Sequence, residues 1–157
     1  VSWEGRSCAC FSPEGEGPFP LLVLCGWHME EKLPKFAAQL PPTLQDVAAA
    51  VINQTQVYEY KDAAWKHAAE DREVMVLHCL VVDPLKGGKG YGRAFVAYYE
   101  DYAKQHGFPA LRMDTNVKNK RARKLYHTLG YEEAGIVQCI FNGIPNVQLV
   151  CLEKYLG

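Results

Sequence analysis

The stretch from Arg72 to His106 constrains the fold more than any other part of this chain. Glu73–Val82 is an almost continuous apolar run rich in Val and Leu, which is typical of a strand covered on both faces. Asp83-Pro84 ends this strand, and a glycine-rich turn follows. The next residues predict a helix, because Phe95, Tyr98, Tyr99, Tyr102 and Ala103 recur at helical spacing and Gly107 is placed to cap its C-terminus. A buried strand, a tight turn and an amphipathic helix are therefore expected.

The glycine-rich turn, Gly87-Gly88-Lys89-Gly90-Tyr91-Gly92, has the composition of an anion-binding cradle. Glycines allow successive backbone N–H groups to approach one point, and the following helix adds the positive end of its dipole. This arrangement favours a diphosphate. The turn lacks the Gly-Lys-Ser/Thr ending of a Walker loop, and no acidic residue is suitably placed for a ribose. Taken alone, the turn also fits a strand-to-helix connection that binds no ligand.

A second segment, from Asn119 to Tyr131, reads Asn-Lys-Arg-Ala-Arg-Lys-Leu-Tyr-His-Thr-Leu-Gly-Tyr. Together with the turn, it resembles the GNAT superfamily of acyl-CoA-dependent N-acetyltransferases, in particular bacterial-type members. That superfamily carries Arg/Gln-x-x-Gly-x-Gly after a strand, and later Asn-x-x-Ala-x-x-Leu-Tyr-x-x-x-Gly-Phe/Tyr on a second helix. The second pattern is matched here at every position. The first is matched except at Gly87, where Arg or Gln is usual, and Lys86 and Lys89 can supply charge nearby.

The resemblance implies an α/β (α+β) fold, in which helices flank a central mixed, mostly antiparallel sheet with two splayed parallel strands. A single domain is expected over 1–157, with a core over 46–156 that follows the superfamily pattern and an N-terminal segment, 1–45, that does not. In that segment, strands are expected over 7–12 and 20–26, a loop over 13–18 and a helix over 29–40. The core is expected to hold strands over 47–54, 73–82, 109–114, 134–141 and 147–154, irregular or short helical structure over 58–66, a helix over 118–129 and a hairpin loop over 142–146.

Charge is unevenly distributed along the chain. Residues 86–124 contain ten Lys or Arg and three Asp or Glu, although the whole chain has a net charge of −1. The segment expected to hold a polyanionic ligand is thus the only strongly basic one. A pI near 6.6 and the lack of a recognisable nucleic-acid-binding module argue against nucleic acid as the partner.

The cysteines favour reduced thiols and a cytoplasmic location. None of the six forms a Cys-x-x-Cys pair, and Cys8-Ala9-Cys10 has no histidine at zinc-like spacing, so no metal is expected. Cys79, Cys139 and Cys151 lie in apolar strand-like runs, where free cysteine acts as a small hydrophobe. No apolar run approaches the roughly 20 residues of a membrane helix, and no basic leader precedes the first run. Neither membrane association nor a signal peptide is expected.

The resemblance implies where acetyl-CoA binds. In the superfamily, the two parallel strands diverge near their C-terminal ends and bind the pantetheine arm through the freed backbone groups. The N–H of Leu80 is therefore expected to face the thioester carbonyl, and Val82 to pair with pantetheine. The pyrophosphate is expected at the turn and the start of its helix, formed by Gly87, Gly88, Lys89, Gly90, Tyr91, Gly92 and Arg93.

Two residues of the second helix match functional positions of the superfamily. Tyr126 matches a tyrosine that lies near the sulfur and donates a proton to the departing thiolate; the alternative is a core tyrosine. Asn119 matches a position whose side chain often bonds the cofactor; the alternative is a helix-start residue that satisfies its own backbone. A solvated helix face explains most of the basic run over 118–124, although one or two of its side chains can reach nucleotide phosphates.

His78 is the predicted general base. An imidazole inside an apolar strand must find a partner or face a cavity, and strand alternation predicts that His78 shares a face with Leu80. Some amine acetyltransferases of the superfamily use a histidine at the corresponding position to take the ammonium proton; the alternative is a structural histidine. Asp114, near the end of the facing strand, can orient an imidazole or a substrate ammonium. The remaining histidines, at 28, 67, 106 and 127, are expected to be solvated.

The sequence thus predicts an N-acetyltransferase that moves an acetyl group from acetyl-CoA to a primary amine of a small molecule or peptide, by direct attack in a ternary complex. One alternative is a non-catalytic acyl-CoA-binding regulatory module, and another is a general phosphate-binding domain. The acceptor itself is not specified, because similar scaffolds serve many amines. The final strand, if exposed, can pair with a second copy, so a homodimer is possible.

Overall fold

The computed structural model describes residues 2–3, 6–7, 41–45, 47–141 and 143–157. The strands expected over 7–12 and 20–26, the loop over 13–18 and the helix over 29–40 lie outside these residues, apart from Ser7. That residue belongs to a short antiparallel ribbon of β1 (Ser2–Trp3) and β2 (Arg6–Ser7).

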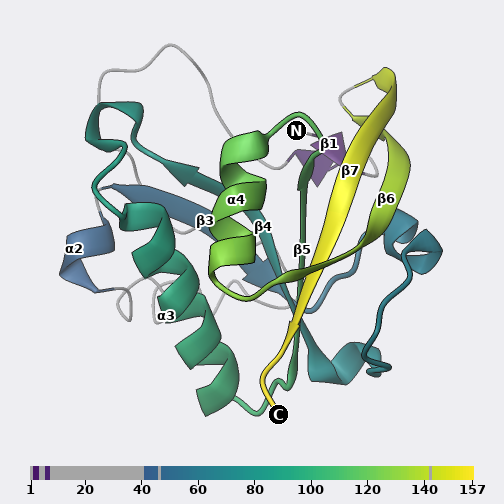
Figure 1. Ribbon diagram of the computed structural model, residues 1–157, viewed down its shortest axis with the longest axis horizontal. Coiled ribbons are helices and arrows are strands. Elements are labelled where there is room, and N and C mark those ends of the chain that lie inside the picture. The colour runs from purple at the N-terminus through teal and green to yellow at the C-terminus, as the bar shows by residue number, and fades with distance from the viewer. Residues whose placement is uncertain (1, 4–5, 8–40, 46, 142) are drawn as a thin grey trace.

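A mixed sheet of five strands organises the described core (Figure 1). Its parallel pair, β4 and β5, is connected through a helix, and its other neighbours are antiparallel. This arrangement confirms the expected mixed, mostly antiparallel sheet. In spatial order the strands are β3 (Ala48–Asn53), β4 (Val74–Val82), β5 (Ala110–Asn116), β7 (Ile144–Tyr155) and β6 (Glu132–Phe141).

Two helices, α3 (Tyr91–Gln105) and α4 (Lys120–Thr128), lie on one face of the sheet, which we call the front face (Figure 1). As the helical spacing predicted, α3 turns its apolar side to the sheet, where Phe95, Tyr99 and Ala103 are buried and Tyr98 and Tyr102 are partly buried. Gly107 follows its last turn with φ 76°. The front-face core joins α3, the sheet and Tyr126 of α4. Its largest members include Phe95, Val96, Tyr99, Leu77, Leu111, Met113 and Leu152. The four-residue helix α2 (Pro42–Gln45) precedes β3.

The opposite face, which we call the back face, is covered by the segment between β3 and β4. This segment contains two short 3-10 helices, η1 (Tyr58–Asp62) and η2 (Asp71–Glu73), so the irregular structure expected over 58–66 is confirmed. Tyr60 of η1 is 2% exposed and packs against apolar residues of β4, β5, β6 and β7. The sheet is therefore packed on both faces, as the continuous apolar run of β4 predicted.

The hairpin between β6 and β7 is tighter than expected. The predicted loop over 142–146 is wrong in extent, because β7 begins at Ile144, which pairs with Phe141. Asn146 has φ 61° and lies next to a register shift, so the turn-like residues Ile-Pro-Asn form an irregular start of the strand.

Candidate functional site

The parallel strands β4 and β5 pair over only part of their length. Their ladder runs from Val74–Ala110 to Leu77–Met113 and then stops, although β4 continues to Val82 and β5 to Asn116. Figure 1 shows the two strands diverging toward these ends. The divergence expected from the resemblance is therefore present. It leaves backbone groups of both strands free of each other at the end where the glycine-rich turn begins.

A β-bulge in β4 overturns one expectation about His78. Two residues of β4, Cys79 and Leu80, stand opposite Ala50 alone, and Cys79 has φ 53°. The bulge shifts the alternation by one residue. Leu80 and Val82 therefore pack with the front-face core. His78, paired with Val51, points to the other side of the sheet.

The prediction that His78 and Leu80 share a face is thus wrong. On the back face, His78 Nε2 lies 3.1 Å from the Thr55 carbonyl oxygen and 3.2 Å from Asn53 Oδ1. Both atoms accept, so Nε2–H donates and Nδ1 carries the lone pair in the neutral ring. Burial lowers the pKa of His78 from 6.5 to about 4. The ring therefore stays neutral near pH 7, and its free nitrogen is a weak base.

The glycine-rich turn presents unpaired donors. Gly88 (φ 80°) and Gly90 (φ 84°) adopt the left-handed conformation, in which glycine is the least strained residue. Gly90 is the N-cap of α3, and the first N–H to donate into the helix is that of Ala94. Within the described residues, the N–H groups from Gly88 to Arg93 donate to no backbone carbonyl. These donors and the helix dipole make the N-terminal end of α3 suited to binding an anion.

Two glycines of the turn bring α4 close to it. A Cβ on Gly92 would lie 3.3 Å from Leu125 Cδ2 and 3.8 Å from Val82 Cγ2. A Cβ on Gly87 would lie 3.2 Å from the Pro84 oxygen and 3.9 Å from Arg121 Nη2. The first turn of α3 therefore packs directly on α4 and β4.

Of the two lysines expected to supply charge near Gly87, Lys86 is a weak candidate. Its Nζ lies 4.0 Å from Asp83 Oδ2, and Asp83 also caps the short helix η3 (Pro84–Lys86) by accepting from the Leu85 N–H. Lys89 and Arg93 are exposed. In the basic run, Arg123 is committed to structure, because its guanidinium donates to both oxygens of Glu133 and to the Val117 carbonyl.

Tyr126 is the buried residue of α4. It is 7% exposed, belongs to the front-face core and meets the ring of Tyr131 edge-on. Burial, with a smaller contribution from the charge of Asp114, raises the pKa of Tyr126 to about 12. A protonated hydroxyl at this position can donate a proton but does not lose it to solvent. The core-tyrosine alternative and the catalytic role are compatible. The ring packs in the core, and the charge of Asp114 acts on the hydroxyl group.

Asn119 is the N-cap of α4. Its Oδ1 accepts from the Ala122 N–H at 3.1 Å, so the helix-start interpretation describes its side chain in this structure. The amide nitrogen has no hydrogen-bond partner among the described residues. A contact between Asn119 and a cofactor stays a prediction.

Asp114 has a partner that the sequence did not reveal. Its Oδ2 accepts from the Tyr60 hydroxyl at 2.8 Å, across 54 positions of the chain. Burial raises the pKa of this carboxyl group, and the Tyr60 hydrogen bond partly opposes the shift. Asp114 follows Met113, where the ladder between β4 and β5 ends. A carboxylate held by a buried tyrosine thus borders the opening.

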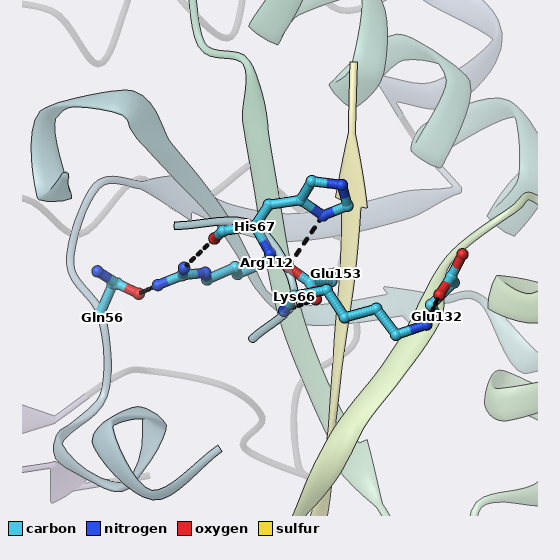
Figure 2. Close-up of polar contacts among 6 residues, drawn as sticks. All are labelled: Gln56, Lys66, His67, Arg112, Glu132 and Glu153. Atoms are coloured by element: carbon cyan, nitrogen blue, oxygen red, sulfur yellow. Dashed lines mark hydrogen bonds and ion pairs between the residues drawn. The ribbon is translucent and has the colours of Figure 1, made fainter. Parts of the chain in front are cut away.

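A buried polar cluster fastens the back-face segment to the sheet (Figure 2). Arg112 and Glu153 are 6% and 4% exposed. Glu153 accepts from the Lys66 N–H at 2.5 Å, and Arg112 donates to Gln56 Oε1 and to the His67 carbonyl. These residues are far apart in sequence, so no local pattern predicted the cluster.

His67 is partly solvated, as expected, since its side chain is 43% exposed. Its ring also stacks on Tyr155 at 4.7 Å, and its Nδ1 lies 3.5 Å from Glu153 Oε2, which is long for a hydrogen bond. Arg112 also lies over the ring of Trp65, 4.3 Å from its centroid. His106 and His127 are exposed as expected, and His28 lies outside the described residues.

Sequence similarity places the chain in one acyltransferase family. The sequence profile of the acetyltransferase (GNAT) family matches residues 10–131, so the chain belongs to that family. The match includes most of the segment 1–45, which the sequence motifs alone did not connect to the family. An uncharacterised N-acetyltransferase from Methanocaldococcus jannaschii is 36% identical over 77 residues, which are 49% of this chain and 34% of that protein.

Solved structures agree on the fold. An N-acetyltransferase from Staphylococcus aureus Mu50 superposes with a TM-score of 0.57 at 16% identity, over 72% of this chain and 62% of its own. A Salmonella typhimurium protein described as an acetyltransferase, and solved with its cofactor acetyl-CoA, superposes with a TM-score of 0.56 at 17% identity, over 71% and 58%. The chain thus spans between about a third and two thirds of these proteins.

Among the described residues, no helix has the length and apolar character needed to cross a membrane. No group of three or more His, Cys, Asp or Glu side chains among them is arranged to hold a metal ion.

Proposed function

We propose that this protein is an acetyl-CoA-dependent N-acetyltransferase that acts on a primary amine of a small molecule or peptide. The observation that carries the proposal is the early end of the β4–β5 ladder beside a turn whose N–H groups, from Gly88 to Arg93, are unpaired. The opening suits a narrow arm, and the turn suits a diphosphate. Coenzyme A combines both parts in one molecule.

The residues fit this cofactor. Glycine at 90 and 92 keeps side chains away from the turn, and the charge of the segment 86–124 is strongly positive. Gly87 to Arg93 would hold the pyrophosphate, whereas Leu80 and Val82 border the opening that would receive the pantetheine arm. Asn119 lies at the start of α4, beside the same site. Acetyl-CoA supplies an activated thioester, whose carbonyl carbon is open to attack by a neutral amine.

Transfer needs two proton movements that this chain can provide. The amine nitrogen forms a bond to the acetyl carbon, and the carbon–sulfur bond breaks. Tyr126 donates its hydroxyl proton to the departing thiolate, a role that suits a phenol kept protonated by burial. The nitrogen loses a proton to a base on the back face of the sheet.

Two groups are candidates for that base. His78 is the base predicted from the sequence, and its Nδ1 is the available nitrogen. Asp114 is the second candidate, because its carboxylate borders the opening and is held there by the Tyr60 hydroxyl. Burial raises the pKa of this carboxyl group, which favours proton uptake.

Calorimetric titration with acetyl-CoA, with ADP as the control, tests the cofactor. We expect binding that is selective for acetyl-CoA. A panel of primary amines with a thiol-release assay then tests transfer. Binding without transfer to any amine would favour the non-catalytic acyl-CoA-binding module. Equal binding of ADP and acetyl-CoA would favour a general phosphate-binding domain, and no binding at all would contradict the proposal.

A further inference from the structure

Gly87 brings no side chain to the glycine-rich turn, so any side-chain contact to a phosphate there must come from another residue. Its backbone does not require glycine, because φ −59° and ψ 154° are open to any residue. A Cβ there would approach the Pro84 oxygen to 3.2 Å, and the next nearest atom is Arg121 Nη2 at 3.9 Å. The space beside Gly87 is thus bordered by a guanidinium from another element, α4.

The position of Arg121 is set by helix packing. Leu125 lies one turn further along α4, on the same side of the helix. Its Cδ2 lies 3.3 Å from where a Cβ of Gly92 would be. Arg121 and Leu125 therefore lie beside the two ends of one glycine-rich turn, Gly87 and Gly92. The first turn of α4 is thus placed next to the start of α3.

Arg121 is also uncommitted among the described residues. Its guanidinium makes no hydrogen bond or ion pair there, whereas that of Arg123, two positions along, is bound to Glu133. A guanidinium presents planar, paired N–H donors that match phosphate oxygens. It sits next to backbone N–H groups of the turn that likewise find no acceptor in the described chain.

We propose that Arg121 is a phosphate-binding residue for the diphosphate of coenzyme A and acts from the space beside Gly87. This inference rests on the proposed function. It places a cation of the neighbouring helix at the turn, so the site has a side-chain charge there although Gly87 supplies none.

The test compares the Arg121→Ala and Lys124→Ala variants by titration with CoA and with dephospho-CoA, which lacks the 3′-phosphate. Lys124 is the matched control, because it is an exposed cation on the same helix with no contact to the turn. We expect Arg121→Ala to weaken binding of both ligands roughly tenfold, the loss of one charge-assisted contact. Lys124→Ala should change affinity less than about twofold, because an exposed charge away from the ligand contributes little.

A second variant keeps the inference falsifiable. Adding Gly87→Arg to the Arg121→Ala protein should recover most of the lost affinity, whereas adding Gly87→Ala should not. Unchanged affinity of a folded Arg121→Ala variant, equal losses in Arg121→Ala and Lys124→Ala, or no recovery by Gly87→Arg would each overturn it while leaving the proposed function intact. Failure of the unmodified protein to bind CoA would instead overturn both.

Discussion

At the scale of single residues, burial shifts the pKa values of side chains around the opening between β4 and β5 in different directions. It raises the pKa of Tyr126 and of Asp114, and it lowers the pKa of His78. The tyrosine is thereby kept as a proton donor, and the imidazole is kept neutral. Side chains that are ordinary in water thus acquire distinct roles from their positions in the sheet.

Replacing Tyr126 by Phe should lower turnover while leaving the affinity for acetyl-CoA nearly unchanged. The ring packs as before, and only the donated proton is lost, so we expect a decrease in kcat of roughly 100-fold. Steady-state kinetics and calorimetry on the same preparation give the two quantities. A variant with full turnover would show that another group protonates the thiolate.

His78 should make stability depend on pH. Its pKa is about 4 in the folded chain and 6.5 when exposed, so the unfolded chain binds the proton first as pH falls. The full contribution is present above pH 6.5 and is lost as pH falls from 6.5 to 4. The slope from this one group is at most about 1.4 kcal/mol per pH unit. Urea unfolding at several pH values measures it.

The His78→Gln variant removes this titration and retains a donor for the Thr55 carbonyl, so its stability should be flatter in the same window. His106→Gln, at an exposed histidine, is the control. The pH–rate profile of His78→Gln also tests the base. If the pH–rate profile of His78→Gln loses its fall at low pH, and the profile of Asp114→Asn matches that of the unmodified protein, His78 is the base and Asp114 is not.

At the scale of elements, the helix α3 depends on a left-handed residue at its start. Gly90 has φ 84°, and a Cβ there would meet no atom within 4 Å. The Gly90→Ala variant should therefore lose about 1 kcal/mol of unfolding free energy through backbone strain alone. Chemical denaturation checks this loss, with Lys89→Ala as the control. Equal unfolding free energies of the two variants would show that alanine at position 90 introduces no backbone strain.

At the scale of the whole molecule, the sheet is held between the helices in front and the segment 54–73 behind. The front contact is apolar, whereas the back contact adds the buried cluster of Arg112 and Glu153 (Figure 2). The same segment supplies Tyr60 to Asp114 and Thr55 to His78. The back-face cluster therefore positions one side of the candidate site.

Glu153→Gln should destabilise the protein by roughly 3 kcal/mol, because Arg112 is left buried without its neighbouring negative charge. The control is Glu132→Gln, which breaks the exposed ion pair with Lys66 and should cost far less than Glu153→Gln, because water screens that pair. Unfolding in urea gives both values. Similar losses in the two variants would show that the cluster contributes no more than a surface pair.

The sequence by itself determined the central strand, the turn, both helices and the family, because each is encoded within about a dozen neighbouring residues. It also marked Tyr126, Asn119 and the turn glycines, whose places follow from local helix and turn geometry. Only the tertiary structure decided toward which face of the sheet His78 points. That face depends on the bulge at Cys79, whose φ of 53° cannot be predicted from a cysteine in the sequence. The neighbours of Asp114, Arg112 and Arg121 were likewise decided there. Those contacts join residues 34 to 56 positions apart, and no local periodicity specifies which distant side chains meet.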